Sequence, residues 1–215
     1  MVDRQRDHEP IIQNFRKWLR DNSASGTLGQ TETVNTQFMP SQRLDTWLKE
    51  ANNTRNLLRA LWPEPDDVPV QPKEIWGKCS KGFATLLLIG KGHFIQHFIK
   101  HDSLWDGQMP FNDCPSNFPT TGDDPNFFKK FAECQWQFFP HTFLPDVIDI
   151  HLNLTRILPI AHKELLAPGG FADTYKIQLH QAYDLLTTPL DQRRVSMIGL
   201  QPSPHDEPPV KLTGN

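Results

Sequence analysis

The stretch Phe83–Ile89, FATLLLI, is the longest apolar run in a chain of 215 residues. Drawn as a helix, it carries apolar side chains on nearly every side, which is typical of a helix buried inside a protein. It is far too short to cross a bilayer, which takes about 20 residues. The stretch therefore predicts the central helix of a mainly α fold.

Helical spacing of apolar residues also appears before this segment. The stretch PIIQNFRKWLR predicts a helix that opens at Pro10, and Ser41 is suited to cap a second helix that extends to Leu61. Between them, the polar stretch DNSASGTLGQTETVNTQ predicts a flexible segment. Four prolines within residues 63–72 end the second helix, because proline lacks an amide donor.

Aromatic residues are densest in FFKKFAECQWQFF, which runs from Phe127 to Phe139. We expect this stretch to form a helix that packs against Phe83–Ile89 and makes the core rich in aromatic rings. Between the two helices, Gly90–Gly92 predicts a break, followed by a half-exposed helix that ends near His101. The aromatic residues of the cluster are Phe127, Phe128, Phe131, Trp136, Phe138 and Phe139.

The later part of the chain contains strand patterns. VIDIHLNL alternates apolar and polar residues over 147–154, and LLAPGGFADTYKIQLH, over 165–180, has the glycine turn and alternation of a short β-hairpin. Beyond Leu186 the chain is rich in proline and charge, which predicts disorder. The expected division is an N-terminal helix and flexible segment (1–40), a helical domain (41–145), a strand-rich piece (146–186) and a disordered tail (187–215).

The composition of the chain indicates which partners and which cellular compartment to expect. The net charge is -3, with 22 Lys and Arg against 25 Asp and Glu, so nucleic acid is not an expected partner. The three cysteines are widely spaced and odd in number, which favours reduced thiols over a disulfide framework or a zinc site. Because the N-terminus is charged and has no apolar segment, we expect a cytoplasmic protein that has no membrane partner.

Several short motifs follow one another in the chain: FATLLLIGK, HFI, MPF, CQWQF, ILPI and GGFADTYK. In this order they resemble the helical region that precedes the kinase domain in a family of fungal kinase-like proteins. The resemblance covers about residues 38–180. It implies a regulatory or interaction region that binds another protein in signalling and then runs into a glycine-rich nucleotide loop.

The resemblance places a degenerate nucleotide loop in the hairpin. The kinase pattern G-x-G-x-x-G-x-V puts Ala167, Gly169 and Ala172 at the three glycine positions, so only one glycine remains. The alternative is an ordinary hairpin turn. The resemblance implies these candidate cofactor-binding residues: Gly169, Gly170, Phe171, Ala172 and Lys176. ATP is the implied cofactor if a kinase domain is completed elsewhere, and otherwise no cofactor is expected.

The residues that perform phosphoryl transfer have no counterpart here. A kinase needs the aspartate of an H-R-D loop as base and a D-F-G aspartate for magnesium, and the 215 residues contain neither motif. We therefore expect no catalytic residue and a non-enzymatic interaction or regulatory role. The alternative is a fragment of an ATP-dependent serine/threonine protein kinase.

Two further residue groups are candidate sites. His93, His97 and His101 are spaced to share one face of a helix, so a metal-responsive protein is a third alternative. Trp105, Met109 and Phe111 lie beside polar residues, a composition typical of a protein interface. The alternative for these three is that they fold back over the core. No pattern in the sequence indicates an oligomeric state.

Overall fold

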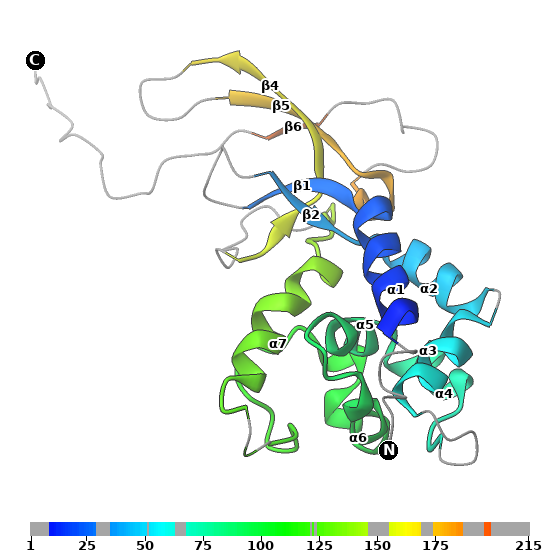
Figure 1. Ribbon diagram of the computed structural model, residues 1–215. Coiled ribbons are helices and arrows are strands. Elements are labelled where there is room, and N and C mark those ends of the chain that lie inside the picture. The colour runs from blue at the N-terminus through cyan, green and yellow to red at the C-terminus, as the bar shows by residue number, and fades with distance from the viewer. Residues whose placement is uncertain are drawn as a thin grey trace, which may run out of the picture.

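The computed structural model describes residues 9–28, 35–50, 52–62, 68–120, 122, 124–145, 155–168, 174–186 and 196–198. A bundle of short helices forms one end of the molecule, and two small antiparallel sheets form the other (Figure 1). The expectation of a mainly α fold with an aromatic core is confirmed at this level.

The helices are short, and several are joined by single 3₁₀ turns. The α-helices are α1 (Glu9–Asn22), α2 (Ser41–Lys49), α3 (Asn53–Leu61), α4 (Pro72–Lys78), α5 (Ser80–Leu88), α6 (Ile95–Lys100) and α7 (Phe127–Gln135). The strands are β1 (Ala24–Leu28), β2 (Asn35–Phe38), β3 (Ile157–Leu158), β4 (Ile160–Ala167), β5 (Thr174–Leu179) and β6 (Ser196–Ile198). The 3₁₀ turns are Gly92–Phe94, Asp102–Leu104, Asp106–Gln108, Trp136–Phe138 and Gln181–Tyr183.

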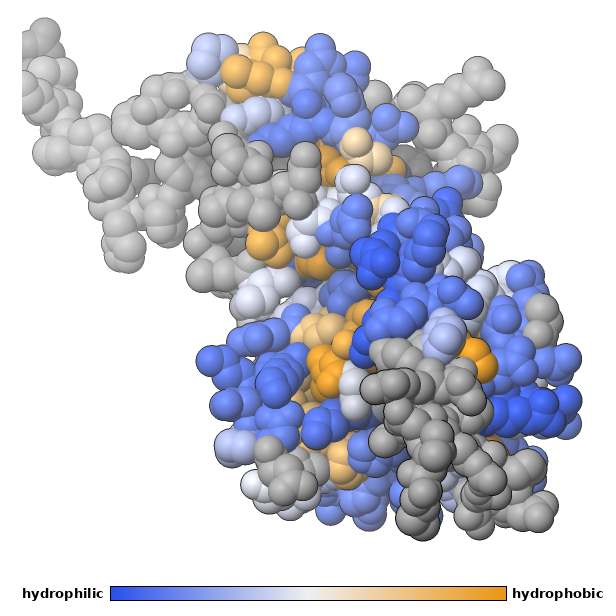
Figure 2. Space-filling model, viewed as in Figure 1, coloured by the Kyte–Doolittle hydropathy of each residue, from blue (hydrophilic) through white to orange (hydrophobic). Residues whose placement is uncertain are grey.

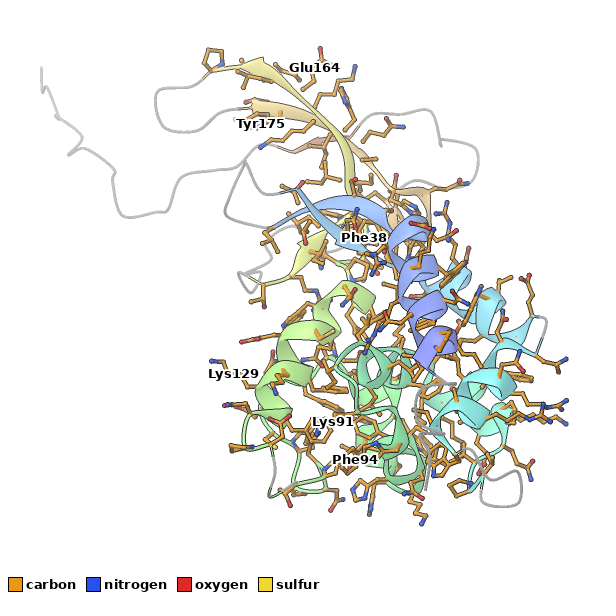
Figure 3. All side chains as sticks on the ribbon, viewed as in Figure 1. Phe38, Lys91, Phe94, Lys129, Glu164 and Tyr175 are labelled. Atoms are coloured by element: carbon orange, nitrogen blue, oxygen red, sulfur yellow. The ribbon has the colours of Figure 1, made fainter. Side chains whose placement is uncertain are left out.

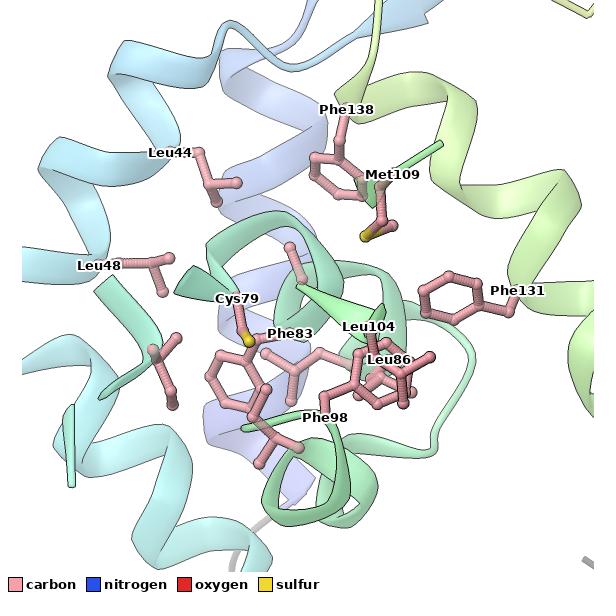
Figure 4. Packing of buried hydrophobic residues seen from close by; sticks show 14 of the residues in the cluster. Leu44, Leu48, Cys79, Phe83, Leu86, Phe98, Leu104, Met109, Phe131 and Phe138 are labelled. Atoms are coloured by element: carbon pink, nitrogen blue, oxygen red, sulfur yellow. The ribbon is translucent and has the colours of Figure 1, made fainter. Parts of the chain in front are cut away.

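Helix α5 is the centre of the main core, as its sequence predicts. The side chains of Phe83, Leu86 and Leu87 are at most 1% exposed. Figure 4 shows Phe83 and Leu86 among side chains from α2, α6 and α7. Helix α7 packs against α5, which confirms the predicted partner. Trp136 differs from its predicted place in the core, because it is only half-buried and Gln135 takes the fully buried position.

Side chains from distant parts of the sequence cap both ends of α5. At the N-terminal end, the backbone N–H groups of Lys81 and Gly82 donate to the Asp106 carboxylate at 2.8 and 2.9 Å. At the C-terminal end, Arg16 donates to the carbonyl oxygen of Leu87 at 3.0 Å. An anion at the first end and a cation at the last complement the helix dipole. Gly90, with φ +73°, then turns the chain away from the helix.

The structure divides the single helix predicted over 41–61 into α2 and α3. Asn52 separates them with a left-handed φ of 59°, a conformation that asparagine tolerates better than most residues. The Asn53 side chain donates to the carbonyl oxygen of Trp47 at 2.8 Å, so it satisfies an acceptor at the end of α2. The predicted half-exposed helix before His101 is likewise divided, into a 3₁₀ turn and α6.

The polar segment that was predicted to be a flexible segment contains two strands instead. Strand β1 pairs with β2 on one side and β3 on the other, all antiparallel, in the order β2-β1-β3. Gly26 lets β1 and β3 lie this close together, since a Cβ there would lie 2.7 Å from the carbonyl oxygen of Leu158. Phe15 and Leu19 of α1, which precede the boundary expected at residue 40, lie in the main core.

The second sheet contains the predicted hairpin. Strands β4 and β5 pair antiparallel, and β6 pairs with the other edge of β5. Within the tail that was predicted to be disordered from residue 187, the structure describes the short strand β6 (Ser196–Ile198). The rest of that tail and the strand predicted over 147–154 lie outside the described residues.

A small second core joins the sheets to the helices. Phe38 and Tyr183 meet edge to face, with ring centres 5.4 Å apart, and Ile157 completes the buried cluster. The Tyr183 hydroxyl accepts a hydrogen bond from the backbone N–H of Ser41 at 3.1 Å. This bond satisfies a free donor at the start of α2, so the segment after β5 is tied to the helical part.

Candidate functional site

The predicted nucleotide loop falls mostly outside the described residues. These do not include Gly169, Gly170, Phe171 and Ala172. Lys176 lies on β5 directly opposite Glu164 of β4, with the charged groups 3.8 Å apart and both side chains exposed. Figure 3 shows Glu164 and Tyr175 on the hairpin, far from the helical core. The described part of the hairpin therefore presents Lys176 to solvent in a cross-strand ion pair.

The three histidines of the metal hypothesis do not share one helix face. His93 lies in the 3₁₀ turn before α6 and packs against Phe94, with ring centres 4.3 Å apart. The rings of His97 and His101 lie 4.4 Å apart, and His97 is hydrogen-bonded to the Asn117 carbonyl oxygen. Over the described ranges, no group of three or more His, Cys, Asp or Glu side chains could hold a metal ion.

The expected interaction residues separate into two kinds. Met109 and Phe111 are only 8% and 7% exposed and belong to the main core, so they correct the prediction of an exposed patch. Phe111 is held there by the buried Gln135, whose side-chain amide accepts from the N–H of Phe111 at 2.8 Å and donates to its carbonyl oxygen at 2.7 Å. Trp105 is only partly buried. It is the one of the three that remains available to a partner.

Trp105 lines an open groove between the end of α4 and the turns that follow α6. The groove has a volume of about 590 Å³ and is lined by Gly77, Lys78, Asp102, Ser103, Trp105, Asp106, Gly107 and Gln108. The Lys78 ammonium lies 4.2 Å from the centre of the Trp105 ring, a cation–π contact that orders both side chains. A Cβ added at Gly77 or Gly107 would meet nothing within 4 Å, so the backbone is accessible at both positions.

The carboxylate of Asp106 forms the inner wall of the groove. Burial raises its pKa to about 6, although the N–H groups of Lys81 and Gly82 and the charge of Lys81 act in the opposite direction. Burial also lowers the pKa of Lys81, whose ammonium lies 4.2 Å above the Phe139 ring. Because both oxygens of Asp106 accept backbone hydrogen bonds from α5, this residue holds the groove in place rather than acting on a substrate.

The arrangement suits binding rather than chemistry. An aromatic ring, charges of both signs and exposed backbone are elements of a recognition surface. Sequence reasoning identified Trp105 but missed Lys78 and Asp106, which reach the groove from two different elements. In the sequence, the local indication of these two residues is an adjacent glycine: Gly77 precedes Lys78, and Gly107 follows Asp106.

No protein-family model, curated protein or solved structure matches the chain. No helix in the described ranges combines the length and the apolar character that a membrane span requires.

Proposed function

We propose that the chain is a non-catalytic interaction module whose groove around Trp105 binds an extended segment of a partner protein. The observation that carries this proposal is the groove itself. It combines a partly exposed tryptophan, in contact with Lys78, with two glycines at which an added Cβ would meet open space. Tryptophan is enriched among the residues that dominate binding energy at protein interfaces.

The chemistry of the walls indicates the kind of segment that fits. Gly77 and Gly107 are exposed and carry no side chain, so an extended peptide can approach the chain closely at both positions. Asp102 adds an exposed carboxylate to the lining, which favours a basic residue in the partner. The Trp105 ring offers an apolar surface for an aromatic or aliphatic side chain.

The resemblance described above supports a place for this module in signalling. We propose that it is the helical regulatory region of a fungal protein-kinase-like protein, situated before the nucleotide lobe. The antiparallel β4-β5 hairpin lies where the resemblance puts the first strands of that lobe. This role leaves catalysis to residues outside the 215 of this sequence.

Selection from a random peptide library, followed by calorimetry with the selected peptides, tests the groove. Trp105→Ala is expected to weaken binding about tenfold or more, as for a hot-spot residue. Gly107→Leu is expected to block the groove, because its side chain would project into open space without a clash in the fold. Trp62→Ala, which removes a partly buried tryptophan outside the groove, is the matched control. Peptides that bind both groove variants as tightly as the unchanged protein would refute the proposal.

The hairpin favours a second candidate, a fragment of an ATP-dependent kinase. It places Lys176 on a strand that follows the predicted nucleotide loop. Titration with Mg²⁺ and ATP tests this candidate, and Lys176→Ala should then weaken nucleotide binding. We expect weak binding and no phosphate transfer, because methyl groups at Ala167 and Ala172 stand where the kinase pattern has glycine. Tight binding that depends on Lys176 would favour the kinase fragment.

A further inference from the structure

Two basic side chains beside β3 have buried polar atoms without hydrogen-bond partners. His141 is only 9% exposed, and in the described structure neither its Nδ1 nor its Nε2 is bonded. The same is true of the buried Nε of Arg156. Buried polar atoms in proteins are almost always hydrogen-bonded, so three unpartnered nitrogens in one place indicate that something else binds there.

The backbone holds these two residues together. The N–H of His141 donates to the carbonyl oxygen of Ile157 at 2.8 Å, which sets His141 beside the residue that follows Arg156. The Arg156 guanidinium lies 5.9 Å from the centre of the Trp136 ring. The Phe143 ring meets the imidazole edge to face, with ring centres 4.8 Å apart. Two aromatic rings thus flank the two bases and limit their contact with water.

We propose that His141, Arg156 and Trp136 form a binding site for a small oxyanion, a carboxylate or a phosphate group. The guanidinium carries a permanent positive charge and a free Nε donor, and its planar fork matches the oxygens of either group. The imidazole supplies a second donor. Burial, and secondarily the charge of Arg156, lowers the pKa of His141. A bound anion would reverse this and draw a proton onto the ring.

The ring nitrogens of His141 give a direct measurement of binding. We expect inorganic phosphate or acetate, added to the full chain at constant ionic strength, to raise the pKa of His141 by about 1 unit or more relative to chloride. Histidine ring NMR signals followed against pH report this shift, and the missing signal of His141→Gln assigns it. A response to phosphate alone identifies a phosphate site, and a response to acetate identifies a carboxylate site. If neither oxyanion shifts His141 relative to chloride, the proposal is wrong.

Arg156→Gln is the decisive variant. It is expected to weaken oxyanion binding about tenfold or more and to abolish the shift of His141, because the permanent charge is removed. Arg59→Gln, on the exposed surface of α3, is the matched control and should change neither. A folded Arg156→Gln protein in which phosphate or acetate still shifts His141 would overturn the proposal. If Arg156→Gln unfolds, the pKa of His141 in phosphate, acetate and chloride, measured on the unchanged protein, tests the proposal by itself.

Discussion

The helical part and the β4-β5-β6 sheet differ in how much of their surface they bury. Helix α5 has six consecutive buried residues, from Gly82 to Leu87. In β4, by contrast, every residue from Ala161 to Ala167 is exposed. Leu165 and Leu166 are 50% and 45% exposed, and Figure 2 shows hydrophobic colour at this end of the molecule. Because burial of apolar surface drives folding, the free energy of unfolding comes chiefly from the helical part.

The comparison also predicts a difference in local stability. Regions with few buried contacts and solvent-exposed hydrogen bonds open with a small free energy, while core helices open only with the whole protein. Strand β5 contributes Ile177 and Leu179 as its buried side chains, so one face of the sheet retains a limited apolar contact. The sheet is therefore expected to open before the helices.

Phe83→Ala tests the helical side of the comparison and should have the largest effect. It removes a fully buried ring at the centre of the core and is expected to lower the free energy of unfolding by about 3–5 kcal/mol. Chemical denaturation followed by circular dichroism measures this loss. A change of less than 1 kcal/mol would mean that α5 is not the centre of the fold.

Asp106 makes the stability of the helical part depend on pH. Its pKa is raised from 3.8 to about 6 in the folded protein, so the folded state binds more protons between these values. The free energy of unfolding should then fall by about 2–3 kcal/mol as the pH rises from 4 to 6. The difference between the unchanged protein and Asp106→Asn, measured by denaturation at each pH, isolates this contribution.

The exposed Asp102, in the same loop, provides the control for this measurement. Asp102→Asn separates the effect of losing a carboxylate from this loop from the effect of losing the buried one. If Asp106→Asn shows the same slope as the unchanged protein, the buried carboxylate does not titrate in this range and the assignment is wrong.

Gly90→Ala tests the turn that ends α5. Its φ of +73° is a conformation in which a Cβ is strained, so the substitution should cost about 1 kcal/mol. Gly107→Ala, for which φ does not lie in this region and no atom is within 4 Å of the added Cβ, should be close to neutral. Equal melting temperatures for the two variants would contradict the strain argument.

The smallest effect is expected in the exposed sheet. Leu166→Ser replaces a side chain that is 45% exposed and should change the free energy of unfolding by no more than about 0.5 kcal/mol. Hydrogen exchange should show β4 amides exchanging well before those of α5. Protection of β4 equal to that of α5 would show that the sheet belongs to the same cooperative unit as the core.

The sequence predicts features that depend on neighbours along the chain, and it misses those that depend on distant partners. The burial of Phe83–Ile89 and the β4-β5 hairpin follow from local periodicity and turn residues. The break between α2 and α3 at Asn52 was missed, because asparagine permits a left-handed backbone conformation but does not require one. Strand β1 was missed because its pattern is polar. Its second partner, β3, comes only after the helical part in the sequence.

The groove illustrates the same limit. Trp105 was found from composition, but Met109 and Phe111 were assigned to the same surface because sequence gives no direction to a loop side chain. The position of Phe111 depends on the Gln135 amide, which comes from α7. Periodicity did not indicate that a polar residue would occupy a fully buried position of α7.

The hydrogen bond between Ser41 and Tyr183 joins residues 142 positions apart, which has a consequence for the order of folding. Closing a flexible loop of that length costs about 4 kcal/mol of chain entropy by the logarithmic scaling of loop closure, apart from a constant term. The intervening helices make mostly nearer contacts and can collapse before the ends meet. Once they have done so, Phe38 and Ile157 are already close together and the effective loop is short. The β2-β1-β3 sheet, which joins the two ends of the helical part, is therefore expected to form last, after the helices have packed together.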